Sequence, residues 1–351
     1  MRLGCRGFGE RVGRLVLQSL IESYRKSAML HVAGKLGIAD LLAKGPLSSN
    51  ELAQSLGADA VSLHRFLRGL VVLGICSEEH DGRFGVTKLG ALLQDTNARS
   101  LRGEAVNSGE SYAAWGNLLH SVMTGETAFG HAFKVDVWDY RKQAPELDEA
   151  FNKAFREKSP RIAREILSAY DFSSVRTIAD IGGGYGALLA AILASSPSLS
   201  GILFDQPHVI AKSVACLKAA GLTERCRAVG GDFFANVPDG ADVYLFKSVL
   251  HDWNDSQCER ILKNCRQALK AKGKLLLIER IMPGRAKEDP SMVMLDLRMM
   301  TMTGGRERNE REFRVLFEAA GLTLTRIIPL PSGFNIIEGI CAGAPGLGAS
   351  D

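Results

Sequence analysis

From Val175 onward, runs of β-type residues alternate with runs of helical periodicity. The β-type runs read TIADIG, GILFDQ, RCRAVGGD, DVYLFKS and KLLLIER, and helical segments such as ALLAAILA separate them. This alternation predicts an α/β domain in which crossover helices connect the strands of a parallel sheet. Ligands of such open sheets bind beyond the carboxyl ends of the strands, so residues at these ends are the first candidates for function.

A glycine-rich loop, DIGGGYG, begins at Asp180 and follows the first of these strands. Gly182 and Gly184 let the backbone turn tightly and approach a ligand closely. Together with Ala187 they also satisfy the G-x-G-x-x-G/A dinucleotide fingerprint. The loop by itself therefore leaves open a nicotinamide dinucleotide, S-adenosylmethionine, or tight strand-to-helix packing without any ligand.

Three aspartates at successive strand ends favour S-adenosylmethionine. Asp180 would repel the pyrophosphate that a dinucleotide brings to a helix N-terminus, but it would attract a sulfonium or an ammonium group. Asp205 ends the next strand and can accept both ribose hydroxyls of either cofactor. Asp232 follows the third strand and can accept the adenine amino group while Phe233 packs on the ring. Any one of these aspartates could be a helix cap or turn residue, and the argument depends on their recurrence.

His251 lies just past the strand DVYLFKS, in the segment VLHDWND. An imidazole suits proton transfer because its ordinary pKa is close to the working pH. Glu279, at the end of the strand LLLIE, and Glu307, in the loop GGRER, follow at the next two junctions. A carboxylate bonded to the imidazole would orient it and stabilise the imidazolium. The alternatives are a structural histidine, an exposed charge at Glu279 and a helix cap at Glu307.

The first hundred residues predict helices and one hairpin. Apolar residues recur at helical spacing over 11–43, and a further apolar helix covers 61–74. The segment 74–86, with Asp81-Gly82 at its turn, predicts the hairpin. These elements outline a winged helix. The helix that would read DNA is mostly apolar, so we expect it to serve packing or dimerisation.

The composition excludes several function classes. The 351 residues carry a formal net charge of +4, which gives no reason to expect nucleic acid or a membrane surface as a partner. The seven cysteines are scattered without a CxxC pair, so we predict neither a metal site nor a disulfide framework, and reduced thiols in a cytoplasmic protein. The apolar run at 15–20 is too short to span a membrane, and a targeting role for the arginine-containing N-terminus is the weaker alternative.

The strings DIGGGYG, FDQPHVI, GGDFF, LFKSVLHDWND, LLIERIMP and GGRERNEREF together resemble a known family. They are similar to the plant caffeic-acid and isoflavone O-methyltransferases, to bacterial methyltransferases of natural-product biosynthesis and to acetylserotonin methyltransferases. The resemblance implies a class I methyltransferase, Rossmann-like sheet of seven strands whose last strand, 334–342, is antiparallel. It also implies an N-terminal winged-helix-like domain that is all-helical apart from the hairpin and that forms a homodimer. The expected division is 1–105 for dimerisation, 106–172 for connecting and pocket helices, 173–343 for S-adenosylmethionine binding and catalysis, and 344–351 for a flexible tail.

The resemblance also assigns roles to residues. It implies that His251 is the general base between Glu279 and Glu307, in a reaction that needs no metal. The cofactor-binding positions expected from the loop, the strand ends and the resemblance are Asp180, Gly182, Gly184, Asp205, Asp232, Phe233 and Lys247.

The expected acceptor is an aromatic small molecule with a hydroxyl, most simply a phenol, whose proton an imidazole can remove. Its candidate contacts are Phe151, Phe155, Asp252, Met299 and Met302, although the aromatic and methionine side chains could equally belong to the core. Ser248 replaces a tryptophan of the plant proteins, which suggests a wider acceptor pocket. Two other functions stay open, an NAD(P)-dependent oxidoreductase and a non-catalytic, cofactor-binding winged-helix regulator.

Overall fold

The computed structural model describes residues 4–343, except for the side chains of 4–11, 146, 150 and 153–158. The chain divides into two compact units, Met1–Ala113 with Pro145–Ala154, and Ala114–Ala144 with Phe155–Asp351. The helical stretch 106–172 is therefore shared between the units. The tail 344–351, predicted to be flexible, lies outside the described residues.

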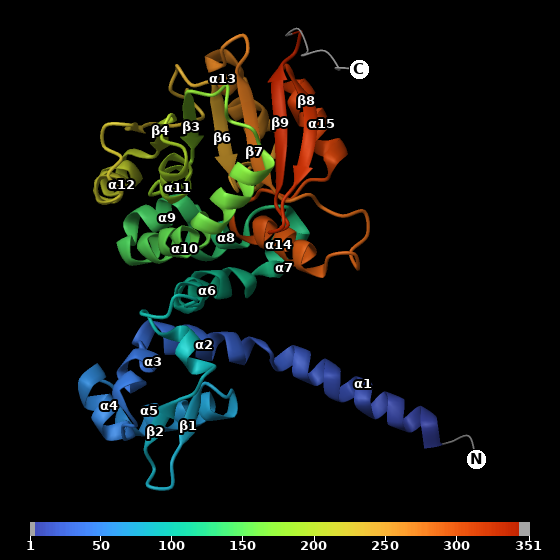
Figure 1. Ribbon diagram of the computed structural model, residues 1–351. Coiled ribbons are helices and arrows are strands. Elements are labelled where there is room, and N and C mark those ends of the chain that lie inside the picture. The colour runs from blue at the N-terminus through green and yellow to red at the C-terminus, as the bar shows by residue number, and fades with distance from the viewer. Residues whose placement is uncertain (1–3, 344–351) are drawn as a thin grey trace. The chain divides into compact units, whose positions relative to one another are not determined.

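The first unit consists mainly of helices (Figure 1, blue to teal). The hairpin predicted around Asp81-Gly82 is confirmed, because its two strands pair antiparallel. The elements are α1 (Gly4–Glu22), α2 (Tyr24–Leu36), α3 (Ile38–Leu41), η1 (Leu42–Lys44), α4 (Ser49–Leu56), α5 (Ala60–Val72), β1 (Cys76–Glu78), β2 (Phe84–Val86), η2 (Gly90–Leu93) and α6 (Arg102–Trp115).

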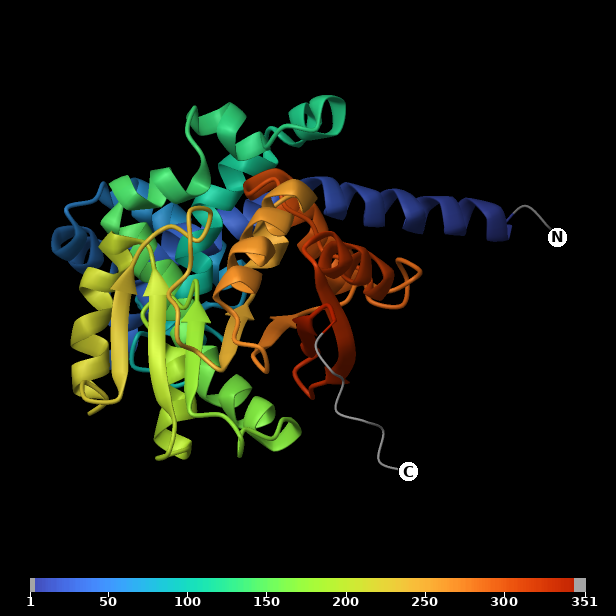
Figure 2. The same ribbon diagram turned by 90° about the horizontal axis from the view of Figure 1, so that it is seen from above.

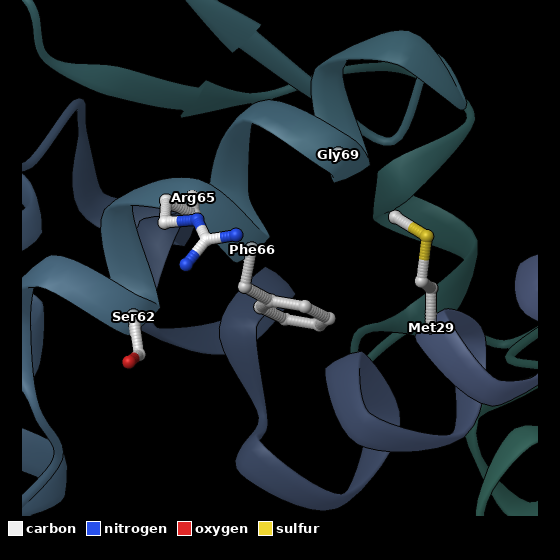
Figure 3. Close-up of a pocket in the computed structure, with 5 residues that line it drawn as sticks. All are labelled: Met29, Ser62, Arg65, Phe66 and Gly69. Carbon is white, nitrogen blue, oxygen red and sulfur yellow. The ribbon is translucent and has the colours of Figure 1, made fainter.

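Local sequence explains where these helices begin and what they bury. Ser48 caps α4 and forms a capping box with Glu51, which satisfies N–H groups that a helix start leaves open. The apolar face of α5 buries Leu63, Leu67 and Leu70 in the core of this unit. A cavity of about 330 Å³ adjoins α5, as Figure 3 shows, and is lined by Met29, Ser62, Arg65, Phe66 and Gly69. None of the predicted catalytic or cofactor residues lines this cavity.

The second unit is built on a seven-stranded sheet with the order β5-β4-β3-β6-β7-β9-β8. The first five of these strands are parallel, and β9 is antiparallel to both of its neighbours. The predicted α/β fold and the antiparallel last strand are thus confirmed. The strands are β3 (Thr177–Ile181), β4 (Ser200–Asp205), β5 (Cys226–Gly230), β6 (Val243–Lys247), β7 (Lys274–Glu279), β8 (Leu322–Pro329) and β9 (Asn335–Cys341).

Helices cover both faces of this sheet, as Figure 2 shows. On one face, α11 and α12 pack on the sheet with the C-terminal part of α10, and on the other α13 and α15 do so. Successive residues of β3, β6 and β7 alternate between the two cores, which is why these central strands are mostly apolar. The helices are α7 (Leu118–Thr124), α8 (Ala128–Phe133), α9 (Val137–Gln143), α10 (Pro145–Ala169, shared with the first unit), α11 (Ala187–Ser195), α12 (Pro207–Ala219), η3 (Leu250–Asp252), α13 (Asp255–Ala268), α14 (Pro290–Met302) and α15 (Glu310–Ala319).

Neither a membrane span nor a metal cluster is evident in the described part of the chain. Between residues 4 and 343, no helix has both the length and the apolar character to cross a bilayer. The described His, Cys, Asp and Glu side chains form no group of three or more that could hold a metal ion.

Candidate active site

The turn that carries His251 leaves the carboxyl end of β6. Ser248 follows the strand in a left-handed conformation, with φ of 54°, which turns the chain away from the sheet. Val249 leads into η3, whose second residue is His251. The side chain of His251 is 15% exposed, so the imidazole is largely removed from water at the sheet edge predicted to hold the site.

Glu307 makes the direct contact with the imidazole. Its Oε1 lies 2.8 Å from Nδ1 of His251, and the carboxylate is buried. Because an ionised carboxylate only accepts hydrogen bonds, this contact places the proton of the neutral imidazole on Nδ1. Nε2 then carries the lone pair that can take a proton from an acceptor. Oδ1 of Asp252 lies 3.9 Å from Nε2, so this carboxylate borders the same side of the ring.

Glu279 contacts the backbone of the turn instead of the imidazole. Its Oε1 accepts the backbone N–H groups of Val249, at 2.9 Å, and Leu250, at 3.0 Å. Its Oε2 lies 3.8 Å from His251 Nδ1, which is beyond hydrogen-bond distance. The sequence predicted two flanking glutamates, and both are at the imidazole. Only one of them is bonded to it, while the other holds the backbone of the turn.

The surrounding carboxylates raise the pKa of His251. Burial alone would lower this pKa by disfavouring the charged ring, but Glu279, Asp252 and Glu307 together outweigh it and raise the pKa well above the ordinary 6.5. Burial in turn raises the pKa of Glu279 and of Asp252. The site is therefore built to stabilise an imidazolium, the species that forms once a base has accepted a proton.

Glu307 does not cap the following helix. Asn309 caps α15, in a capping box with Glu312. Glu307 is instead held through its own backbone, whose N–H donates to Oδ1 of Asp296 on α14 at 2.8 Å. Asp296 was not among the residues expected from the sequence, since nothing in the pattern of α14 relates it to the loop that follows the helix.

The glycine loop fits a cradle for a ligand. Gly182, Gly184 and Gly186 have φ between 59° and 79°, in the left-handed region that L side chains rarely adopt. A Cβ at Gly183 would lie 2.7 Å from Oδ2 of Asp180, so a side chain there would fill the space beside this carboxylate. A Cβ at Gly182 would lie 2.9 Å from Val249, which follows β6.

Asp180 is a buried carboxylate beside the glycine loop. Its side chain is buried, and among the described residues its Oδ2 has no hydrogen-bond partner. Burial, followed by the charge of Asp205, raises the pKa of Asp180 to about 7, while Lys247 acts in the opposite direction. A buried carboxylate with an open acceptor is suited to an ammonium or sulfonium group and unsuited to a pyrophosphate.

The other strand ends supply the rest of the predicted cofactor site. Asp205 accepts the N–H of Gly184 at 2.8 Å through Oδ2 and that of Gln206 through Oδ1, so it lies directly against the glycine loop. Asp232 accepts the N–H of Phe234 as a turn residue. The ring of Phe233 lies 3.9 Å from the Cβ position of Gly182, next to the same loop.

An aromatic cluster that the sequence did not predict adjoins these residues. Trp253 lies edge-on to Phe233 and Phe234, with ring centroids 5.8 and 4.8 Å away, and stacks on Trp138 of α9 at 6.1 Å. Trp253 belongs to the HDW motif, which was a usable signal. No pattern in the sequence pointed to Trp138, 115 residues earlier in the chain.

The structure describes four of the five predicted acceptor residues, and one of them, Asp252, borders the imidazole of His251. Met299 and Met302 of α14 are buried in the second unit, and Met302 belongs to a small core with Phe129 of α8. Phe151 is placed in the first unit. The side chain of Phe155 lies outside the described part of the structure.

The order of the seven-stranded sheet and the glycine loop after β3 are those of a class I, S-adenosylmethionine-dependent methyltransferase. Sequence comparison finds an O-methyltransferase domain over residues 115–323 and an O-methyltransferase dimerisation domain over 18–96. The protein belongs to this O-methyltransferase family. The oxidoreductase and the non-catalytic regulator, which the sequence had left open, are thereby set aside.

Individual relatives agree with this assignment. The phenazine O-methyltransferase of Lysobacter antibioticus is 45% identical over 325 residues, covering 92% of this chain and 95% of that protein. The solved structure of a mitomycin 7-O-methyltransferase has a TM-score of 0.90 at 35% identity, with 96% of this chain and 100% of that one covered. The O-methyltransferase of neocarzinostatin biosynthesis, solved with S-adenosylmethionine and 2-hydroxy-5-methyl naphthoic acid, has a TM-score of 0.81 at 31% identity, covering 90% of this chain and 96% of that one.

Proposed function

We propose that this enzyme methylates a phenolic hydroxyl of an aromatic natural product, with His251 as the general base. The observation that carries the proposal is the contact between His251 Nδ1 and Glu307, which in the neutral ring leaves the lone pair on Nε2. S-adenosylmethionine supplies a methyl group bound to a sulfonium sulfur. When the methyl group is transferred, the rest of the cofactor is released as a neutral thioether. Asp180, the glycine loop, Asp205, Asp232, Phe233 and Lys247 are the residues proposed to hold this cofactor.

The residues of the chain perform the proton transfer and the positioning. Nε2 of His251 removes the hydroxyl proton. The acceptor oxygen, now a phenolate, can then attack the methyl carbon. Glu307 keeps Nδ1 protonated and stabilises the imidazolium that results. The proposed acceptor contacts are Asp252, Met299, Met302, Phe151 and Phe155. The three relatives act on or bind phenazine, mitomycin and naphthoate compounds, which supports an aromatic acceptor.

We further propose that the enzyme is a homodimer formed through its first unit. Figure 1 shows α1 extending away from the other helices of that unit. Its side chains Leu15, Leu17, Leu20 and Ile21 are each at least 59% exposed, which is unfavourable for a helix facing water. A second copy is the occupant that the dimerisation domain over 18–96 implies.

The test is a panel of aromatic acceptors with methyl-labelled S-adenosylmethionine, comparing phenols with the matching anilines and methyl ethers. We expect label on phenols, and His251→Ala should lower the rate about 10²–10⁴-fold while leaving cofactor affinity unchanged. Raising the pH toward the pKa of the phenol should partly rescue this variant, because a phenolate needs no base. His80→Ala, at an exposed position of the hairpin, is the control. Label on anilines only, or a wild-type rate for His251→Ala at neutral pH, would refute the proposal.

A further inference from the structure

Arg308 is a fully buried arginine directly after Glu307 in the chain. Its side chain is 1% exposed, and all of its guanidinium nitrogens are used in hydrogen bonds. A buried charge is costly unless it is paired and bonded in this way. The partners of Arg308 therefore show where its charge is needed.

Most of those partners belong to the turn that carries His251 and to the start of the next helix. Nη1 donates to the carbonyl oxygen of Leu250 at 3.0 Å, and Nη2 donates to that of Trp253 at 2.8 Å. Nε and Nη2 also donate to Oδ1 of Asp255, at 2.9 and 2.8 Å. Arg308 thus holds the backbone on both sides of His251.

Glu279 holds the same turn from the other end. It accepts the N–H groups of Val249 and Leu250, so Leu250 is bound through its N–H by a buried carboxylate and through its carbonyl by a buried guanidinium. The residue fixed at both ends is the one that immediately precedes His251. Fixing this backbone fixes the position from which the side chain of His251 extends.

Arg308 and Glu307 are consecutive residues that act on one turn. Glu307 binds the imidazole, Arg308 binds the backbone beneath it, and the carbonyl of Arg308 accepts the N–H of Met282 just beyond β7. The distance from Glu307 to His251 therefore depends on where Arg308 places the turn.

We propose that Arg308 is a positioning residue for methyl transfer, which acts by fixing the place of the His251 imidazole. The inference rests on the proposed role of His251 as the base. A lysine at this position keeps the charge but offers one nitrogen in place of the planar fork, so it cannot reach the carbonyls of Leu250 and Trp253 and the carboxylate of Asp255 in the same geometry.

The experiment is a double-mutant cycle with Arg308→Lys and His251→Ala, measured with the phenol found in the acceptor panel. Arg308→Lys should lower kcat about 10–100-fold with little change in the KM of the acceptor, since a shift of the base of about 1 Å can have an effect of this size. In the His251→Ala background the same substitution should change the residual rate less than about twofold, because the group it positions is gone. Arg306→Lys is the control, because Arg306 also pairs with Asp255 but is 43% exposed.

Two further measurements separate positioning from folding. Thermal unfolding and calorimetric affinity for S-adenosylhomocysteine should show Arg308→Lys folded and able to bind the cofactor product. Its loss of rate should shrink as the pH approaches the pKa of the phenol. A wild-type kcat for Arg308→Lys, an equal loss in the His251→Ala background, or a loss of folding or of cofactor binding that accounts for the rate would each overturn the inference. A fast His251→Ala enzyme would instead overturn the proposed base itself.

Discussion

Nδ1 of His251 and Oε1 of Glu307 lie 2.8 Å apart, although 56 residues separate them in the chain. The bond orients the ring and places a negative charge next to it, and both effects favour proton uptake at Nε2. Glu279 lies almost as near, yet its Oε1 is occupied with two backbone N–H groups of the turn. The two glutamates therefore make different contacts, one with the imidazole and the other with the backbone of its turn.

Glu307→Gln should change the pH dependence of the reaction. Glu307 is one of three carboxylates that raise the pKa of His251 above 6.5, so removing its charge lowers that pKa. A base works only when deprotonated, and the acidic limb of kcat/KM for the acceptor should therefore move to lower pH while the plateau rate falls. Pre-steady-state or steady-state pH profiles of the two enzymes measure this. Glu310→Gln, on the exposed start of α15, should keep the wild-type profile, and an acidic limb that stays in place in Glu307→Gln would contradict the assignment.

Gly305→Ala should damage catalysis through the backbone. A Cβ at this position would overlap the carbonyl oxygen of His251 and would lie 2.5 Å from the nitrogen of Trp253. Because these are backbone atoms, the turn itself has to move, and we expect kcat to fall at least about tenfold as the base is displaced. Gly284→Ala is the matched control in the same unit, since the nearest atom to its Cβ is 4.0 Å away. Equal rates for the two variants would show that the turn adapts without loss.

Asp180→Asn should weaken the binding of S-adenosylmethionine and abolish its pH dependence near neutrality. The pKa of Asp180 is raised to about 7, so its charge appears as the pH rises through that value. Cofactor affinity of the wild type should accordingly increase over this range, whereas that of Asp180→Asn should stay flat and lower. Calorimetric titrations at pH 6 to 8 are the measurement. A pH-independent affinity in the wild type would rule out a cation at this carboxylate.

Leu17→Glu should break the proposed dimer. Leu17 is 59% exposed on α1, and a carboxylate placed in an apolar interface is costly to bury. We expect light scattering to show a dimer for the wild type and a monomer for Leu17→Glu at the same concentration. Val315→Glu, at a similarly exposed position of α15 in the second unit, should remain dimeric. A wild-type protein that stays monomeric at high concentration would refute the dimer.

The periodicity of the chain was sufficient to predict the sheet and the edge at which the site lies. Five β-type runs became β3 to β7, and the acids and the histidine that follow them meet because parallel strands end at the same edge. The strand β8, Leu322–Pro329, was not among the predicted strands, although its first four residues, LTLT, alternate between buried and exposed positions.

The sequence by itself thus predicted the fold class, the type of cofactor and the two glutamates that lie beside His251. Only the tertiary structure decided which glutamate forms a hydrogen bond with the imidazole. Glu307 lies 2.8 Å from Nδ1 and Glu279 lies 3.8 Å from it, and only the shorter distance is a hydrogen bond. The tertiary structure also brought Arg308 to the backbone of a turn 58 residues earlier and Trp138 onto Trp253. Such contacts depend on the packing of distant segments and leave no periodic signal, so no local pattern could have predicted them.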